Sequence, residues 1–266
     1  MSIVVLFNNK DTTMTTQQQV NQAQYQNKSE AYLNSQVHAQ GIEFEKMQNL
    51  IQQHQFKRVL DLGCGGGHVT YQIAAFTEQV IAYDITPEMV NLVTTQSQQK
   101  GFDHVIGQVG AAEQLDFPVE HFDCVISRYS AHHWQSITQA IDEIYRVLRA
   151  DGKVILFDII GNSNPILDTF IQTIETIRDP SHVRNYSLAE WVKIVEQAGF
   201  KVETIEKQSL QLNFQSWVER MQTPVEGIHT IRYLQSKAAD QVQQYYQIQQ
   251  DGTFTSEAVY LVLSKT

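Results

Sequence analysis

The sequence predicts a doubly wound α/β fold, in which helices cover both faces of a mostly parallel sheet. Short, continuous apolar runs recur between residues 58 and 158, which is the pattern of strands that are buried on both faces. Amphipathic helical stretches separate these runs, so the strands are joined by right-handed crossovers in a parallel sheet. The chain has 266 residues, 42% of them hydrophobic, which is enough for one large core.

The strands and helices of the first part follow from local signals. The predicted strands cover residues 58–61, 80–84, 104–109, 122–127 and 154–158. Thr86 and Pro87 predict a helix start, with Thr86 as N-cap, and Gly101 ends that helix. Ser136 and Gln139 form a capping box before the next helix, and the Asp-Gly pair at 151–152 predicts a turn into the fifth strand.

The alternation changes after residue 160. A helix is predicted for residues 165–178 and ends at the Asp-Pro pair at 179–180. Ser187 and Glu190 form a second capping box, whose helix ends at Gly199. A long strand at 200–212, more helix at 214–249 and a last strand at 253–264 complete the chain.

Charge and cysteine content exclude several classes of protein. The formal net charge of −10, with no basic patch, argues against a nucleic-acid binder. Two cysteines, Cys64 and Cys124, are too few for a disulfide scaffold, a zinc ribbon or a three-cysteine iron–sulfur cluster, and they fit a reducing compartment. No apolar run reaches the ~18 residues of a membrane helix. We therefore expect a cytoplasmic protein with no membrane partner.

A glycine-rich loop follows the first predicted strand, where open α/β sheets bind ligands. Asp61 precedes Gly63, Gly65 and Gly67, and the loop leads into a helix. A dinucleotide fingerprint would need a glycine where His68 stands, and the Gly-Lys-Ser/Thr end of a triphosphate loop is absent. Taken alone, the loop also fits a tight strand–helix turn.

Asp84 indicates that the glycine-rich loop binds a ligand. It ends the second predicted strand, 23 residues after Asp61. A carboxylate at this place accepts hydrogen bonds from both hydroxyls of a ribose. The alternative, a cap for the next helix, is less favoured because Thr86 already occupies that position.

These residues resemble the class I S-adenosylmethionine-dependent methyltransferases over about residues 45–160. The motifs that carry the resemblance are residues 59–67, 84, 111–117, 122–127 and 148–152. Residues 126–134 and 181–186 are similar to a bacterial, type 11 branch related to quinone and biotin-pathway methyltransferases. The resemblance implies a Rossmann-like sheet of seven strands with the last strand antiparallel. It also implies S-adenosyl-L-methionine as the cofactor.

The resemblance further implies roles for single residues. Gly63 and Gly65 pass under the methionine and ribose parts of the cofactor, Asp61 supports the ammonium group, Asp84 holds the ribose, and Ala112 meets the adenine. The complete expected cofactor-binding set is Asp61, Gly63, Cys64, Gly65, Asp84, Ile85, Ala111, Ala112, Glu113, Ser127 and Arg128. Members of the family often carry Asp where this chain has Ala111, so Glu113 or a water replaces that acceptor, or adenine binds less tightly.

The chain divides into an extension and one domain. We expect residues 1–14 to be a disordered or non-native extension with Met14 as the natural start, although an ordinary frayed terminus fits as well. Residues 15–266 form the methyltransferase domain. Its predicted parts are a helical N-terminal cap (15–55), a cofactor-binding core (56–160), and helical additions (161–199 and 213–250) that cover the substrate.

The chemistry of transfer points to the residues after the fourth strand. His132 and His133 are the candidate catalytic residues, because histidine takes up a proton near neutral pH. They equally fit loop histidines that only shape the pocket. The candidate acceptor-binding residues are Tyr32, His38, Tyr129, Arg178, His182, Arg184 and Tyr186. The arginines suit an acidic or phenolate acceptor, or they are solvated surface charges. We expect no metal site, because the histidines are dispersed.

Three functions fit the sequence. The favoured one is methyl transfer to a small-molecule acceptor by in-line displacement, by a monomer or a homodimer. The second is a non-catalytic module that binds S-adenosylmethionine. The third, a nicotinamide-dependent reductase, is disfavoured by His68.

Overall fold

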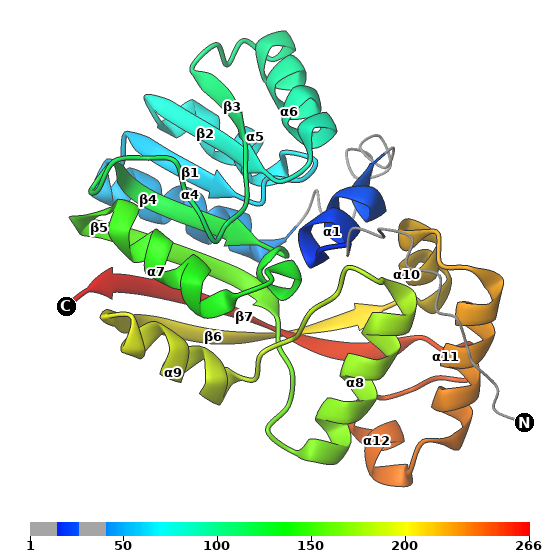
Figure 1. The fold of residues 1–266 in the computed structure, drawn as a ribbon. Coiled ribbons are helices and arrows are strands. Elements are labelled where there is room, and N and C mark those ends of the chain that lie inside the picture. Colours follow the sequence, from blue (N-terminus) through cyan, green and yellow to red (C-terminus); the bar gives the residue numbers. More distant parts are fainter. Residues whose placement is uncertain (1–14, 27–40) are drawn as a thin grey trace, which may run out of the picture.

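The computed structural model describes residues 15–26 and 41–266. These residues build one seven-stranded sheet in the order β3-β2-β1-β4-β5-β7-β6. The predicted α/β class and the antiparallel last strand are confirmed (Figure 1). The proposed extension at residues 1–14 and the candidate residues Tyr32 and His38 lie outside the described residues.

Five strands run parallel in the centre of the sheet. They are β1 (Arg58–Leu62), β2 (Gln79–Asp84), β3 (Val105–Val109), β4 (Phe122–Arg128) and β5 (Leu148–Ile159). The long strands β6 (Phe200–Leu212) and β7 (Phe254–Lys265) form an antiparallel pair, and β7 joins it to β5. The carboxyl ends of the five parallel strands therefore meet at one edge, where ligands of such sheets bind.

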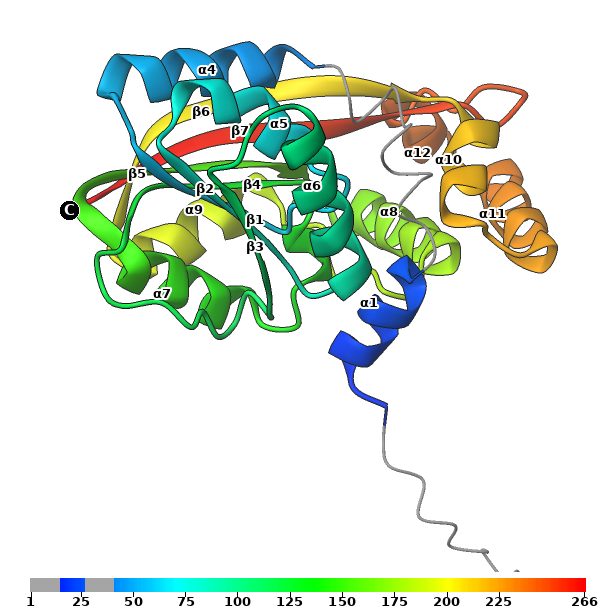
Figure 2. The same cartoon turned by 90° about the horizontal axis from the view of Figure 1, so that it is seen from above.

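Helices cover the two faces of the sheet (Figure 2). One face carries α4 (Ile42–His54), α5 (His68–Ile73) and α6 (Pro87–Gln99), and its core includes Met47, Ile73 and Val93. The other face carries α7 (Ile137–Val147) and α9 (Leu188–Gln197), whose buried side chains include Ile141 and Trp191. Both cores consist of fully buried apolar side chains, so burial of apolar surface holds the sheet between the helices.

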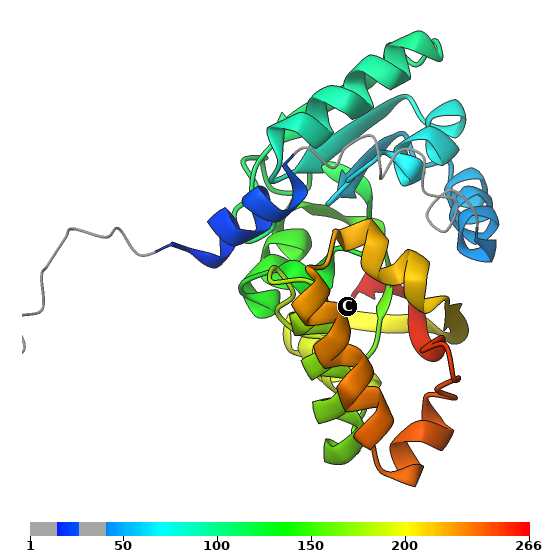
Figure 3. The ribbon, with the colours of Figure 1, turned by 90° about the vertical axis from the view of Figure 1, so that its right-hand side faces the viewer.

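A third apolar cluster lies beyond the carboxyl ends of the strands. It joins α8 (Pro165–Arg178), α10 (Phe214–Met221), α11 (Val225–Lys237) and α12 (Asp240–Tyr245) to the start of β7. The helix α1 (Gln17–Tyr25) lies between this cluster and the sheet edge (Figure 3). None of the residues of α1 is buried, so its apolar contacts contribute little to holding it there.

Three local predictions are corrected. Ser136 caps α7 by accepting from Gln139 N at 3.4 Å, but the return bond from the Gln139 side chain that would complete the expected capping box is not formed. Thr86 is the N-cap of α6, but its side chain makes no cap hydrogen bond; instead its backbone N–H donates to Asp84 Oδ1 at 2.9 Å. The turn expected at 151–152 lies inside β5. It is accommodated as an irregularity, because Phe122 pairs with Leu148 while Cys124 pairs with Lys153. The extra residues of β5 loop out there while the ladder continues on either side.

Candidate functional site

The glycine loop presents its backbone to a cavity at the end of β1. The N–H groups of Gly63 and Cys64 both donate to Tyr83 O, at 2.8 and 3.0 Å, which fastens the loop to β2. Gly65 has a positive φ of 47°, and a Cβ built on it meets no atom within 4 Å. The loop therefore needs glycine at residue 65 and leaves its backbone open to a ligand.

Asp84 connects the loop to the second strand. Its Oδ2 accepts from Gly65 N at 3.0 Å, and its Oδ1 accepts from Thr86 N. Burial raises the pKa of this carboxyl group, while the hydrogen bonds from Gly65 and Thr86 oppose that rise. Each oxygen keeps a lone pair, so the carboxylate remains able to accept from ligand hydroxyls.

Asp61 leaves one buried oxygen without a partner. Its Oδ2 accepts from the N–H and the hydroxyl of Thr70, at 3.0 and 2.6 Å, whereas its Oδ1 has no hydrogen bond within residues 15–26 and 41–266. Burial raises the pKa of Asp61 to about 7, against the lowering effect of the Thr70 hydrogen bonds. A cation next to Oδ1 would supply the missing partner and compensate the buried negative charge. The site therefore fits an ammonium group.

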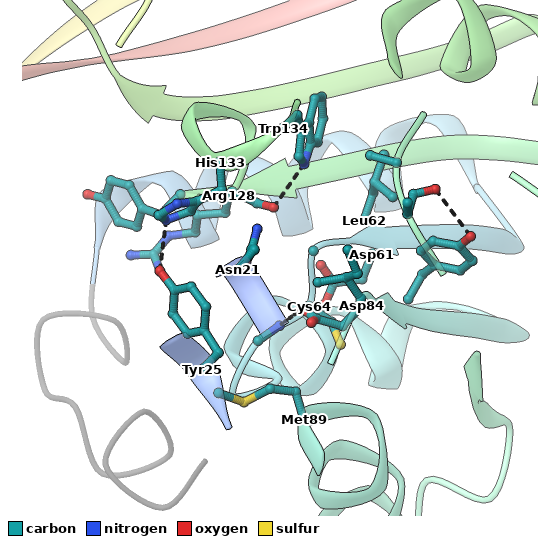
Figure 4. A pocket seen from close by; sticks show the side chains of 18 of the residues that line it. Asn21, Tyr25, Asp61, Leu62, Cys64, Asp84, Met89, Arg128, His133 and Trp134 are labelled. Atoms are coloured by element: carbon teal, nitrogen blue, oxygen red, sulfur yellow. Dashed lines mark hydrogen bonds between the residues drawn. The ribbon is translucent and has the colours of Figure 1, made fainter. Parts of the chain in front are cut away.

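The cavity around these residues has about 980 Å³ of empty space, its open mouth included. Ten of the eleven residues expected to bind the cofactor line it: Asp61, Gly63, Cys64, Gly65, Asp84, Ile85, Ala111, Ala112, Glu113 and Arg128. Ser127, the eleventh, is buried in β4 and is not part of the lining. The structure thus brings residues from four separate segments into one cavity, which we name the cofactor cavity (Figure 4).

Glu113 lies in the wall of the same cavity as Ala111. Its side chain is buried in the cavity wall, and its Oε1 accepts from Ser136 N at 3.2 Å. The Ala111 segment is fixed from behind, because the hydroxyl of Tyr83 donates to Ala111 O at 3.3 Å. The cavity wall near Ala111 therefore carries a carboxylate that can accept a hydrogen bond.

A second cavity adjoins the first, and we name it the acceptor cavity. It has about 1370 Å³ of empty space with its mouth, and α8, α10 and β6 supply much of its wall. Tyr25, Tyr129 and His133 line both cavities. Tyr129 follows β4 directly and has a positive φ of 53°, a strained conformation for a residue other than glycine. The two cavities therefore meet at the end of β4.

His132 lines the acceptor cavity and is held by a carboxylate. Its Nδ1 lies 2.6 Å from Asp158 Oδ1, at the end of β5. Within the described part of the chain, its Nε2 has no hydrogen-bond partner. Burial lowers the pKa of His132, but the Asp158 carboxylate outweighs it, so the net shift is upward. This arrangement leaves Nε2 as a proton acceptor whose ring orientation is fixed.

His133 is engaged at both ring nitrogens. Its Nε2 lies 2.7 Å from the hydroxyl of Tyr25, and its Nδ1 lies 3.2 Å from both the carbonyl and the hydroxyl oxygen of Ser181. Figure 4 shows Tyr25 of α1 reaching toward the imidazole. Burial lowers the pKa of His133, and the neighbouring His132 adds to the effect. His133 therefore fits the role of a neutral connector between α1 and the body of the protein better than that of a base.

The remaining candidate residues divide between the cavity and its surroundings. Arg178 lines the acceptor cavity, where it pairs with Glu175 at 3.1 Å and donates to Trp217 O at 2.9 Å. The other three expected here, His182, Arg184 and Tyr186, line neither cavity. His182 bonds Gln172, Arg184 pairs with Asp168 and Glu190, and Tyr186 packs on Trp191. The structure does not bring these three side chains to the pocket.

Several lining residues were not identified from the sequence. Helix α1 contributes Gln18, Asn21 and Tyr25, and α1 is tied down by amide side chains such as Gln17, whose Nε2 donates to Ser181 O at 2.9 Å. Asp158 carried a usable signal, since it ends a parallel strand. The lining residues of α1, β6 and α10 carried none, because only the tertiary fold places these segments at the same edge.

Comparisons with known proteins agree with this geometry. Residues 60–156 match the family model described as a methyltransferase domain. The chain is 37% identical to YafE of Escherichia coli over 197 residues, which are 74% of this chain and 95% of YafE. It is 34% identical to the methyltransferase YcgJ of Bacillus subtilis, over 77% of this chain and 81% of YcgJ.

Solved structures give the same result. The crystal structure of YcgJ superposes with a TM-score of 0.78 at 31% identity, covering 84% of this chain and 99% of YcgJ. A putative methyltransferase from Bacillus halodurans gives a TM-score of 0.80 at 28% identity, covering 84% and 98%.

The described residues contain neither a membrane-spanning helix nor a metal cluster. Across residues 15–26 and 41–266, no helix is long and apolar enough to cross a membrane. The same ranges contain no group of three histidine, cysteine or acidic side chains arranged to hold a metal ion.

Proposed function

Because the chain belongs to the S-adenosylmethionine-dependent methyltransferases, we propose that it methylates a small molecule held in the acceptor cavity. The observation that carries this proposal is the wall shared by the two cavities, formed by Tyr25, Tyr129 and His133. A cofactor in one cavity and an acceptor in the other would meet at that wall. The acceptor cavity also has room for a small molecule.

The glycine loop and two carboxylates hold the cofactor in this proposal. When bound, S-adenosylmethionine supplies an electrophilic methyl group on a sulfonium centre. Asp61 pairs its unpartnered Oδ1 with the ammonium group, and Asp84 accepts from the ribose hydroxyls. The remaining task of the protein is to align the acceptor and to exclude water.

His132 takes the proton of the acceptor. Its Nε2 faces no other partner in the described residues, and Asp158 holds Nδ1 and stabilises the imidazolium that forms. The acceptor would lose a proton when it takes up the methyl group that the cofactor supplies. The acceptor proton moves to His132 Nε2. His133 remains neutral and connects α1 to the segment at Ser181.

Calorimetry and methyl transfer test the proposal together. The protein should bind S-adenosylmethionine and S-adenosylhomocysteine but not NAD. With tritiated methyl donor, label should enter a compound of a bacterial metabolite extract. Binding without any transfer across such extracts would instead indicate a non-catalytic module, and no binding of either compound would refute the cofactor site.

A further inference from the structure

The side-chain amide of Asn185 is buried in the wall of the acceptor cavity without a partner. Asn185 is only 1% exposed, and its Nδ2 makes no hydrogen bond to any residue that the structure describes. An unpaired buried donor is destabilising, so a fold normally satisfies it. A ligand in the cavity would supply the missing acceptor.

The backbone of Asn185 is fixed, so the position of this amide is not accidental. Gln172 of α8 clamps it from both sides: Gln172 Nε2 donates to Asn185 O at 2.6 Å, and Asn185 N donates to Gln172 Oε1 at 3.0 Å. The two preceding residues are anchored to His132, because Val183 N and Arg184 N donate to His132 O at 2.9 and 3.2 Å. Asn185 is thus held in a constant relation to His132.

The ionic groups that line the acceptor cavity already have partners, some of them outside its lining. Glu175 pairs with Arg178, and Glu43 pairs with Arg128 at 2.7 Å. Asp179 accepts from Ser181 N and from the Ser181 hydroxyl, at 2.9 and 2.6 Å. Arg220 also has a partner. A charged acceptor would have to break one of these pairs in a buried site, which is costly.

The atoms left over in the cavity are suited to neutral hydrogen bonding. Among the described residues they include the Asn185 donor, His132 Nε2, and Glu43 Oε2, whose charge Arg128 already compensates. Apolar and aromatic side chains complete much of the wall, among them Trp217, Leu210, Leu212 and Ile159. Such a lining favours a flat or apolar body with a few neutral polar groups.

We propose that the acceptor is an uncharged, oxygen-bearing molecule and that Asn185 anchors it by donating from Nδ2 to that oxygen. This inference rests on the proposed function and narrows it, since it assigns the substrate class of the same site. It replaces the acidic acceptor expected from Arg178 and Arg184, because the first is paired with Glu175 and the second lines neither cavity.

Three fragments of equal ring size separate the substrate classes. Acetophenone carries a neutral oxygen, benzoate an anion and benzylammonium a cation. Their affinities are measured by saturation-transfer NMR on the full chain loaded with S-adenosylhomocysteine, whose own affinity is measured first by calorimetry. Acetophenone should bind most tightly. Tighter binding of either charged fragment, or no binding of any fragment, would overturn the inference.

Substitutions at residue 185 test whether Asn185 is the side chain that binds the neutral oxygen. Asn185→Leu should weaken acetophenone binding roughly fivefold, the equivalent of one hydrogen bond, without lowering the melting temperature. Asn185→Asp should change the preference toward benzylammonium. Gln197→Leu, at an exposed amide that lines neither cavity, is the matched control and should change nothing.

The same variants and ligands distinguish a failure of the Asn185 proposal from a failure of the proposed function. Equal acetophenone affinity in Asn185→Leu and wild type would overturn the role of Asn185. If S-adenosylhomocysteine itself fails to bind wild type, the proposed function fails instead. The variants should all keep wild-type affinity for S-adenosylhomocysteine, because Asn185 is not part of the cofactor cavity.

Discussion

The cofactor cavity and the acceptor cavity share a wall but are built in different ways. The first is formed largely by loops that directly follow strands β1, β2, β3 and β4, and its central contacts involve backbone groups such as Gly65 N. The second is assembled from side chains of α8, α10, β6 and the segment after β4. The cofactor side therefore depends on the ends of the parallel sheet, and the acceptor side depends on how the additions pack against it.

Because the two cavities are built from different parts of the fold, each can change without the other. Substitution in α8 or α10 changes the acceptor cavity and leaves the glycine loop in place, because the additions have an apolar core of their own. One scaffold can thus keep its cofactor while its acceptor changes. If the two cavities are separate units, a substitution in one should leave ligand binding in the other unchanged.

The largest expected effect is in the acceptor cavity. His132→Ala should lower turnover about 10²- to 10⁴-fold, the range of a lost general base, and leave cofactor affinity unchanged. Steady-state kinetics with the identified acceptor, together with calorimetry, measure both quantities. If cofactor affinity falls in parallel, the cavities are not separate units.

Asp158→Asn sharpens the same test through its pH profile. The rate should rise with pH through the pKa of His132, which the net shift places above its usual 6.5. The groups that act on His132 are Asp158, His133, His182, Glu175 and Asp179. Removing the Asp158 charge lowers that pKa, so the midpoint should move to lower pH. An unmoved midpoint would assign the titration to another group.

The next effect belongs to the cofactor cavity. Asp84→Ala should weaken S-adenosylmethionine binding by about 1–3 kcal/mol, or about 5- to 150-fold, because it removes the ribose acceptor and the Gly65 contact. Asp103→Ala, at an exposed carboxylate, is the control. Unchanged affinity in a folded Asp84→Ala protein would contradict the assignment of the cavity.

The cofactor side was largely predictable from sequence, and the reason is local. Gly65 and Asp84 stand at the ends of predicted strands, and strand ends in a parallel sheet converge without knowledge of the rest of the fold. The whole span of β6 and that of α8 were also predicted, because apolar runs and caps define them.

The acceptor side was predictable only in part. His132 and Arg178 were identified, whereas Asn185 and Tyr25 were not, and Arg184 was assigned to a pocket that it does not reach. The sequence spacing of such residues says nothing about which way a long side chain turns. Here the guanidinium of Arg184 pairs with Glu190 and Asp168, and no pattern in the sequence predicts this pairing.

Cofactor affinity should also depend on pH through Asp61. This group is protonated below its pKa of about 7 in the free protein, and binding an ammonium group requires the charged form. Affinity should therefore rise with pH and level off above 7, with a slope of at most about tenfold per pH unit. Asp61→Asn should remove the slope. A slope that survives in this variant would point to a different proton.

Acid stability tests the histidines around the acceptor cavity. Burial lowers the pKa of His182 to about 3, with His132 and His133 adding to the effect, so the folded state keeps it neutral. The unfolded chain binds this proton below pH 6.5, and stability should therefore fall as the pH drops from 6.5 toward 3. His182→Gln should melt with a shallower pH dependence than wild type. An unchanged dependence would show that His182 does not contribute.

The smallest expected effect concerns the wall that both cavities share. Tyr25 is the residue of α1 that lines both, and its hydroxyl lies 2.7 Å from His133 Nε2 and donates to Asp179 Oδ2 at 3.4 Å. Tyr25→Phe keeps the ring but removes these contacts, at a cost of about 0.5–1.5 kcal/mol. Since α1 has no buried residue, this loss should loosen its attachment and weaken the binding of cofactor and acceptor alike, by roughly fivefold.

Calorimetry with S-adenosylhomocysteine and NMR with acetophenone measure the two affinities, and Gln19→Ala, at the exposed cap of α1, serves as the control for helix stability. Weakening of only one ligand would mean that Tyr25 belongs to a single cavity, and that α1 does not couple the two.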